Sequence, residues 1–370
     1  MSDVNMQSAE DQSKDQPKDQ PKDHSANDEP QPKSTPNPQP APKRKLPLPA
    51  KVALVALAAL LAIVAAGAAW FAWAANQGEQ NLKQEASTDA STIQYKGKTY
   101  TYNKDVVSIL VTGYDNDFQA TGKQGISLAD ANFLVCIDTK TNDIKVCAIP
   151  RNSITDVDVY RDGTYSYTDK MQLCLAYIAS KNTEPLAAEN TVKSVRNIFY
   201  GLPITYYAAF NEEVLKEIVD ELGGVKVTVK QTVPGTRMRK GSELTLSGDE
   251  AWRYLSWRDT DVDESALDRQ ARQMEFVQAL FAQLKGADAS KYVGLFNAVS
   301  KHMVTNLGSS EITYLASNLA AGAKGQVSYS QLKGTTTWAK DATGEELERY
   351  NLQNGSVKKT ALDLFYTESK

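Results

Sequence analysis

Histidine and cysteine are scarce in this chain, which has two histidines and three cysteines among 370 residues. Zinc sites draw most of their ligands from these two residue types, usually at short and regular spacings. His24 and His302 stand far apart, and the cysteines show no such spacing, so neither a zinc centre nor a histidine-based catalytic triad is expected. Cys136 and Cys147 lie on neighbouring apolar runs, and the sequence leaves open whether they form a disulfide or remain buried thiols.

The chain also lacks a surplus of positive charge. Its formal net charge is -4, and residues 76–370 carry 33 lysines and arginines against 37 aspartates and glutamates. Proteins that bind nucleic acid generally present a basic face or a basic domain. No nucleic-acid partner is therefore expected.

Large apolar side chains are almost absent from residues 1–50, which contain the near-repeat DQSKDQPKDQPKDHS. Such a composition cannot bury a core, so these residues are expected to form a disordered arm. Residues 51–75 then contain the uncharged run VALVALAALLAIVAAGAAWFAWAA. This run exceeds the ~20 residues that cross a bilayer as a helix, so it predicts a single transmembrane helix.

The flanks of this run predict its orientation. Residues 43–45, KRK, precede it, and the aromatic segment 70–73, WFAW, closes it as an interfacial belt would. By the positive-inside rule the arm lies in the cytoplasm, and the chain is a single-pass protein of the cell membrane with its C-terminal domain outside the cytoplasm. A cleaved signal peptide is the alternative, but the apolar run is long for one and lies far from Met1.

Beyond the membrane the sequence predicts a layered domain. Residues 76–105 are expected to form a stalk and a short hairpin, and residues 106–285 the main domain. A buried strand is predicted for residues 106–117, and further strands for NFLVCID, IKVCAIP, 204–210 and VKVTV. Helices are predicted for 165–180, 191–200 and 211–222, the last capped by Asn211. Strands that alternate with helices indicate an α/β fold with a mixed sheet. Residues 286–370 are expected to continue the same domain as a C-terminal extension, with helices near 291–303 and 309–322.

Arginines gather in one short stretch, where Arg258, Arg269 and Arg272 lie close in sequence. Guanidinium groups bind phosphate oxygens in pairs and keep their charge, so such a cluster suits a pyrophosphate. Ser265 and Asp268 have the spacing of a capping box, which predicts a helix starting near residue 266 with Arg269 and Arg272 on one side. Ordinary solvated arginines on an amphipathic helix are the alternative.

Carboxylates lie at two predicted strand ends. Asp115 follows the first strand and Asp130 precedes the second, while Arg151 follows the third. Magnesium prefers carboxylate oxygens and usually shares its coordination with substrate phosphates. Asp115 and Asp130 are therefore candidate Mg2+ ligands, although acids at strand ends also serve simply as turn formers.

Several blocks of the chain follow one another in a characteristic order: ILVTGYD, LADANFLVCIDTKTNDIKVCAIPRN, NIFYGLPITYYAAFNEEVLKEIVDELGGVKVTV, and LSGDEAWRYLSWR followed by DRQARQ. In this order they resemble the LytR-CpsA-Psr family of cell-envelope proteins. The resemblance implies an α/β/α sandwich with a mixed central sheet and an apolar pocket for a polyprenyl chain. It also implies a magnesium-dependent phosphotransferase, which moves a glycopolymer from a polyprenyl-pyrophosphate carrier to peptidoglycan or another wall acceptor.

The resemblance also implies roles for single residues. Asp115 and Asp130 match its metal-associated acids, with Asp130 a further candidate for the base. The arginines that match its pyrophosphate contacts are Arg151, Arg258, Arg269 and Arg272. Lys170 falls near the Lys-x-x-x-Ala-Tyr block of the family. Phe276 and Leu280, one and two turns beyond Arg272, fit either the core or the lipid pocket.

The chain departs from the family pattern at positions that bear on activity. Leu128 and Ser256 stand where the family usually has arginines, and the smaller departures are Ala131, Asn152 and Ala266. Each missing contact is worth about 1.5–3 kcal/mol, so a loss of ~10²-fold or more in rate is possible. Either a cation such as Arg253, Arg161 or Lys123 replaces the charge, or the protein is a catalytically weak member that binds polyprenyl-linked polymer and regulates envelope assembly.

Overall fold

The computed structural model describes most of the chain beyond residue 91. The described residues are 92–114, 128–138, 140–180, 184–259, 261–284, 295–296, 299–308, 325–340, 344 and 346–369. The predicted arm, the predicted transmembrane run and most of the predicted stalk lie outside them. Within these ranges no helix is long and apolar enough to cross a membrane.

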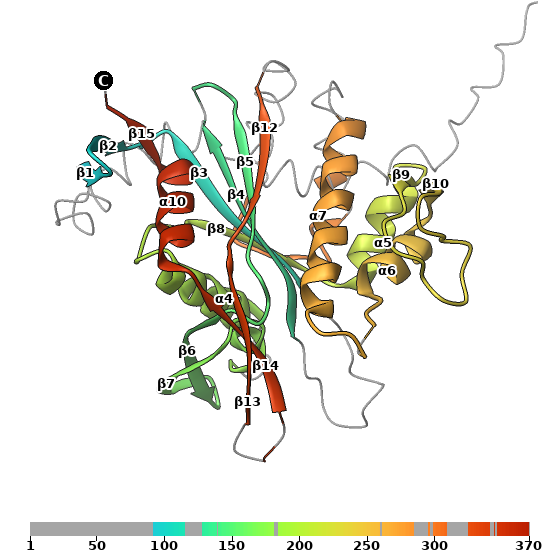
Figure 1. Cartoon of the computed structure of the whole chain (residues 1–370), viewed down its shortest axis with the longest axis horizontal. Coiled ribbons are helices and arrows are strands. Elements are labelled where there is room, and N and C mark those ends of the chain that lie inside the picture. Colours follow the sequence, from blue (N-terminus) through green and yellow to red (C-terminus); the bar gives the residue numbers. More distant parts are fainter. Residues whose placement is uncertain are drawn as a thin grey trace, which may run out of the picture. The chain divides into compact units, whose positions relative to one another are not determined.

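A six-stranded mixed sheet forms the centre of the domain (Figure 1). Its strands, in spatial order, are β11 (Val304–Thr305), β8 (Tyr206–Phe210), β3 (Val106–Tyr114), β4 (Ala129–Asp138), β5 (Ile144–Ala148) and β12 (Val327–Gln331). β4 pairs antiparallel with both β3 and β5, whereas β3 pairs in parallel with β8, and β5 with β12. The predicted strands NFLVCID, IKVCAIP and 204–210, and that at 106–117 as far as Tyr114, lie in this sheet, and the predicted mixed sheet is confirmed.

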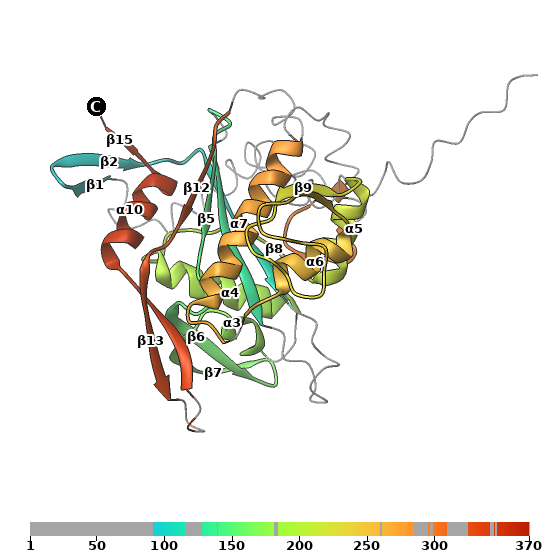
Figure 2. The same ribbon diagram turned by 45° about the vertical axis from the view of Figure 1, so that its right-hand side comes forward.

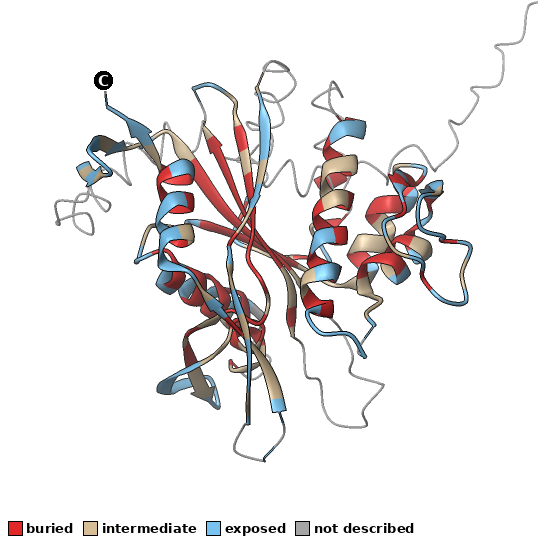
Figure 3. Cartoon of the chain, in the orientation of Figure 1, coloured by how far each residue is buried: buried red, intermediate tan, exposed pale blue. Residues whose placement is uncertain are grey.

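Helices cover both faces of this sheet because successive strand residues point to opposite sides. Ile109 and Val135 belong to the core shared with α5 (Glu212–Glu221), α6 (Gly248–Ser256) and α7 (Ser265–Leu284). Leu110 and Leu134, their immediate neighbours, belong to the core on the other face, with α3 (Leu175–Ile178), α4 (Glu184–Ile198) and α10 (Asn354–Phe365). Figure 3 shows the buried strands between these two groups of helices.

Smaller sheets surround the central one (Figure 2). The predicted hairpin near residues 95–102 is confirmed, and a strand from the end of the chain joins it. These small sheets are β1 (Thr92–Tyr95), β2 (Lys98–Tyr102) and β15 (Tyr366–Glu368); β6 (Ile154–Arg161) and β7 (Thr164–Gln172); β9 (Val225–Thr228) and β10 (Glu243–Leu246); and β13 (Gly334–Lys340) and β14 (Glu346–Leu352).

The helix predicted for residues 165–180 is wrong over most of its length. Residues 164–172 form β7, and only 175–178 are helical. Asp162 and Gly163 both have positive φ, 52° and 74°, as the two central residues of a tight hairpin turn require. The following TYSYT is rich in the threonine and tyrosine that favour strands, so the turn and local propensity together give a hairpin.

Helix boundaries are confirmed in one case and corrected in others. The Asn211 side chain accepts a hydrogen bond from the Val214 amide at 3.1 Å and so caps α5, as predicted. α4 spans 184–198 rather than 191–200. Ser265 is not the N-cap of α7 but its first residue, because the Glu264 carbonyl already accepts from the amide of Leu267. The predicted helix at 309–322 lies outside the described residues. Of the predicted helix at 291–303, residues 295–296 and 299–303 are described, and 295, 296 and 299 are helical.

All three cysteines are buried free thiols, so the open question of a disulfide is settled for this structure. Cys136 and Cys147 face the same core, but Cys136 pairs across the sheet with Lys145 and Cys147 with Leu134. Burial raises the pKa of both thiols, that of Cys147 to about 12. They pack as small apolar side chains.

Candidate active site

Asp130, Arg151 and Arg269 meet at one edge of the central sheet. β4 and β5 are antiparallel, so Asp130 at the start of β4 lies next to Arg151, which follows β5. Arg151 Nε lies 2.7 Å from Asp130 Oδ1, and Arg269 Nη1, from α7, donates to Asp130 Oδ2 at 2.8 Å. The single carboxylate therefore holds two guanidinium groups side by side.

Arg269 is the most deeply buried cation of this group, with 7% of its surface exposed. Burial lowers its pKa, the charge of Asp130 opposes that effect, and Arg151 and Arg258 add to it. Its Nη2 has no hydrogen-bond partner in the part of the chain that the structure describes. Buried donors rarely stay unsatisfied, so this atom is a strong candidate for contact with an anionic ligand.

Arg272 faces a different set of groups, although it is only three residues from Arg269. Its Nε donates to the Tyr254 carbonyl at 3.1 Å, and its two Nη atoms donate to the Trp257 carbonyl and to the side chain of Gln231. Only 2% of its surface is exposed. Tyr254 and Trp257 lie at the C-terminal end of α6, whose last carbonyls lack partners within the helix. Arg272 therefore caps α6 and ties it to α7.

Arg258 lies just beyond α6 and is partly exposed. It interacts electrostatically with Arg269 and with Glu348 of β14. Glu348 also interacts electrostatically with Arg151. The structure thus brings Arg258 into the neighbourhood of Asp130, Arg151 and Arg269, while it directs Arg272 to α6.

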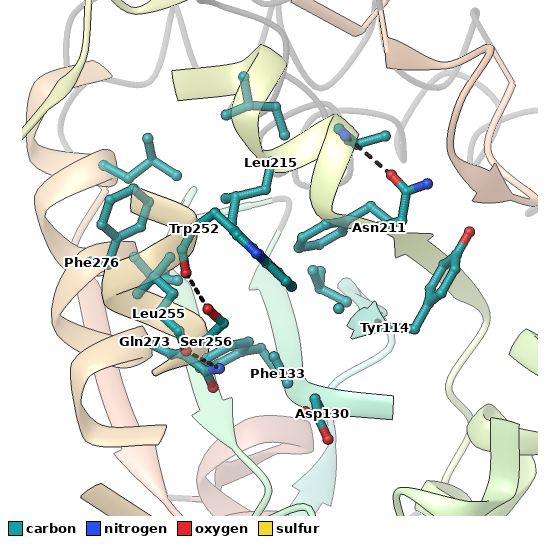
Figure 4. A pocket seen from close by; sticks show the side chains of 18 of the residues that line it. Tyr114, Asp130, Phe133, Asn211, Leu215, Trp252, Leu255, Ser256, Gln273 and Phe276 are labelled. Atoms are coloured by element: carbon teal, nitrogen blue, oxygen red, sulfur yellow. Dashed lines mark hydrogen bonds between the residues drawn. The ribbon is translucent and has the colours of Figure 1, made fainter. Parts of the chain in front are cut away.

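An apolar pocket opens beside Asp130 and Arg269, between the sheet and helices α5, α6 and α7 (Figure 4). It encloses about 970 Å3 of empty space, its open mouth included. Figure 4 shows Asp130 at the lower end of the lining and Leu255, Leu215 and Phe276 above it. Phe276 and Leu280, which fit either core or pocket by sequence, are 2% and 5% exposed and line this pocket, so they serve both roles.

The pocket also contains side chains that the sequence did not single out. Phe210, Trp252 and Gln273 line it. Gln273 donates to the Leu255 carbonyl at 3.3 Å, and its buried Oε1 has no hydrogen-bond partner among the described residues. Apolar periodicity marks such positions as core, and nothing in the sequence distinguishes a core helix from a pocket wall.

The departures from the family pattern fall around this site. Leu128 lies two residues before Asp130, and Ala131 lines the pocket. Ser256 also lines it, and its hydroxyl donates to the Trp252 carbonyl at 2.7 Å. Asn152 and Ala266 are both buried, with 4% and 6% of their surfaces exposed.

The suggested substitute cations are exposed where the structure describes them. Arg253 and Arg161 are exposed, on α6 and at the end of β6, and Lys123 lies outside the described residues. Lys170, on β7, is also exposed and pairs with Asp156 at 2.9 Å.

The candidate magnesium ligands are only half described, because Asp115 lies outside the described residues. Among the residues that are described, no group of three or more acidic, histidine or cysteine side chains could hold a metal. Both oxygens of Asp130 already pair with arginines. Of the two candidate ligands, the described residues therefore contain Asp130 alone.

Comparison with known proteins agrees with this architecture. The LytR_cpsA_psr family model matches residues 71–361. TagU of Bacillus subtilis (strain 168), named a polyisoprenyl-teichoic acid–peptidoglycan teichoic acid transferase, is 30% identical over 239 residues, which cover 63% of this chain and 70% of that protein. Several other curated relatives are spanned over 55% to 60% of their own length.

Solved structures share the fold. TagV of B. subtilis aligns with a TM-score of 0.55 and 22% identity, over 70% of this chain and 96% of that one. A structure titled TagT bound to LIIa-WTA aligns with a TM-score of 0.51 and 22% identity, over 71% and 90%. With the family model matched over most of the sequence, this chain belongs to the LytR_cpsA_psr family.

Proposed function

We propose that this protein is a membrane-anchored extracytoplasmic phosphotransferase. It would transfer a glycopolymer from a polyprenyl-pyrophosphate carrier to peptidoglycan or another wall acceptor. The observation that carries the proposal is the buried Arg269, whose Nη2 has no partner among the described residues, in the lining of an apolar pocket. A polyprenyl pyrophosphate has the matching chemistry, with an apolar chain and an anionic head. The names of TagU and of the TagT complex agree with such a substrate.

The geometry suggests separate roles for the pocket residues, the arginines and Asp130. The polyprenyl chain would lie along Phe276 and Leu280, and the pyrophosphate would meet Arg269 and Arg151. Asp130 would hold these two guanidinium groups in place, because each of its oxygens pairs with one of them. Fixed cations stabilise the charge that spreads over the phosphoryl oxygens during transfer. Arg258 would add positive charge near Arg269, and Arg272 would act indirectly by fixing α6 against α7.

Magnesium remains part of the proposal through Asp115. Magnesium usually binds one or two carboxylates together with substrate phosphates. Asp115 with Asp130 would supply those carboxylates, and the ion would neutralise pyrophosphate charge. Titration of the full-length protein with Mg2+ alone, compared with Asp115→Asn, tests this by calorimetry.

The experiment that tests the function uses the full-length protein in detergent with a polyprenyl-pyrophosphate oligosaccharide. We expect release of polyprenyl phosphate by the wild type and its loss in Asp130→Ala and Arg269→Ala. Arg253→Ala is the matched control, since Arg253 is exposed on α6 and should keep full activity. Failure of the wild type to release product, despite tight binding of the donor, would contradict the transferase.

A second function is favoured by Leu128 and Ser256, which place uncharged side chains beside the site. On this alternative the protein binds the lipid-linked polymer without turning it over and regulates envelope assembly. The double variant Leu128→Arg, Ser256→Arg discriminates between the transferase and the binding protein. A gain of ~10²-fold in product release at unchanged donor affinity would show that the native protein is a weak catalyst.

A further inference from the structure

The β13–β14 hairpin lies against the loop that carries Arg151. The Tyr350 amide donates to the Asn152 carbonyl at 2.8 Å, and Ser153 forms a parallel bridge with Tyr350. Gln172 of β7 donates to the Glu348 carbonyl at 2.6 Å, so β14 also lies beside the β6–β7 hairpin (Figure 2). The hairpin is thus attached on the Arg151 side of the candidate active site.

The same hairpin also contacts the start of the helix that carries Arg269. Thr336 of β13 donates its hydroxyl proton to Glu264 Oε1 at 2.9 Å, and Glu264 immediately precedes α7. One hairpin from the end of the chain therefore bridges both protein segments that deliver the two paired arginines.

One face of this hairpin is turned toward the site. Thr336 lies directly opposite Tyr350, and Trp338 directly opposite Glu348. Side chains of cross-strand pairs, and of residues two apart along a strand, share a face, so all four point the same way. Thr336 reaches Glu264, and Tyr350 is 6% exposed, which identifies this as the inward face.

Trp338 and Glu348 stand out on this face. Trp338 is 52% exposed, unusual for so large an apolar ring. Glu348 is half-buried beside it and interacts electrostatically with Arg258 and Arg151. An exposed indole next to a carboxylate is suited to a sugar, because the ring stacks on the C–H face while the carboxylate accepts hydrogen bonds from hydroxyls.

We infer that the inward face of the β13–β14 hairpin binds the saccharide acceptor, with Trp338 as the platform for a sugar ring and Glu348 as the base for the attacking hydroxyl. The inference rests on the proposed function and supplies its acceptor side. Arg151 and Arg258 would then lie between the donor pyrophosphate and the acceptor sugar.

The proposed step forms one P–O bond and breaks another. The acceptor hydroxyl oxygen attacks the phosphorus that bears the glycopolymer, and a new P–O bond forms. The bond between that phosphorus and the bridging oxygen breaks, polyprenyl monophosphate leaves, and the hydroxyl proton passes to the Glu348 carboxylate. Burial raises the pKa of Glu348, as do Glu264 and Asp263, while Arg258 and Arg151 oppose the rise. A base with a pKa nearer neutrality takes up the proton more effectively.

The platform is tested by binding, which needs no turnover. Full-length protein in detergent is titrated calorimetrically with a peptidoglycan-derived tetrasaccharide. We expect Trp338→Ala to weaken binding at least tenfold, and Tyr200→Ala, which removes a 60% exposed aromatic from the end of α4, to leave it unchanged. Absence of binding by the wild type, or equal binding by Trp338→Ala, would overturn the platform.

The base is tested by transfer rates. We expect Glu348→Gln to lower kcat by ~10²-fold or more, to flatten the acidic limb of the pH profile, and to leave the affinity for the donor unchanged. Glu346→Gln, on the same strand but exposed, is the matched control. A wild-type rate in Glu348→Gln would rule out the base. A wild type that binds the tetrasaccharide but never releases polyprenyl phosphate would refute the transferase and its base, and keep the platform.

Discussion

Substitution by methionine is expected to lower the stability of the protein at Arg272 and its activity at Arg269. Arg272→Met would leave the Tyr254 and Trp257 carbonyls without their donor at the end of α6. Each unsatisfied buried acceptor costs about 1–3 kcal/mol, so we expect a loss of about 3 kcal/mol in unfolding free energy. In a domain of this size that lowers the melting temperature by about 6–12 °C. Methionine is unbranched like the aliphatic stem of arginine and has a similar helix propensity.

Arg269→Met should change stability little. The substitution removes a buried cation whose desolvation opposes folding, and Asp130 keeps its pairing with Arg151. We expect a change of less than about 1 kcal/mol in unfolding free energy, with a loss of ~10²-fold in polyprenyl phosphate release. Arg269→Lys keeps the positive charge but loses the planar guanidinium, so its rate of polyprenyl phosphate release should lie between those of the wild type and Arg269→Met.

The measurements are thermal unfolding followed by circular dichroism and product release measured below the melting temperature of every variant. Normal melting of Arg272→Met together with a defect equal to that of Arg269→Met would refute the division of roles. Arg272 would then act on the substrate itself, as the family resemblance implies.

Three further outcomes follow from buried groups elsewhere. Burial raises the pKa of Glu221 to about 7, so the folded state binds the carboxyl proton more tightly than the unfolded state does. The unfolding free energy should therefore fall as the pH rises from about 4.5 to 7, and Glu221→Gln should remove this pH dependence. Gly248→Ala would place a Cβ 2.5 Å from the Lys216 carbonyl oxygen and should lower the melting temperature, whereas Gly355→Ala, with open space around its Cβ, should not. A thiol reagent should modify none of the cysteines in the folded protein, Cys147 included, and all three after denaturation, as absorbance at the end point will show.

The sequence predicted the parts of the fold that depend on local pattern. β3, β4 and β5 are continuous apolar runs because both of their faces are covered by helices, and such runs are recognisable. Asn211 was recognised as a cap because a short side-chain acceptor before a helix satisfies a free amide. The β6–β7 hairpin was missed because its turn, Asp162–Gly163, is a two-residue signal inside a segment that was taken for a helix.

The site was predictable only in part. Asp130 and Arg269 are 139 residues apart, and their contact depends on the pairing of β4 with its neighbours and on the packing of α7. The family resemblance named both residues, but no local pattern could have joined them. The pocket wall was hidden because Phe276 and Leu280 satisfy the periodicity of a core helix whether or not a cavity lies beside them. Glu348 gave no signal, since an acid on an amphipathic strand is ordinary.

Helix geometry explains how one short motif supplies both a candidate ligand contact and a structural clamp. Residues three apart on a helix differ by about 60° in direction and ~4.5 Å along the axis. For α7 this offset turns Arg269 toward the sheet edge, where Asp130 pairs with it, and Arg272 toward the end of α6. The free carbonyls there attract a cation, as helix C-termini generally do. Arg272 thereby ties α6 to α7, and both helices line the apolar pocket to which Arg269 also contributes, so two arginines one turn apart on α7 set the packing of the pocket wall and place a buried cation in its lining.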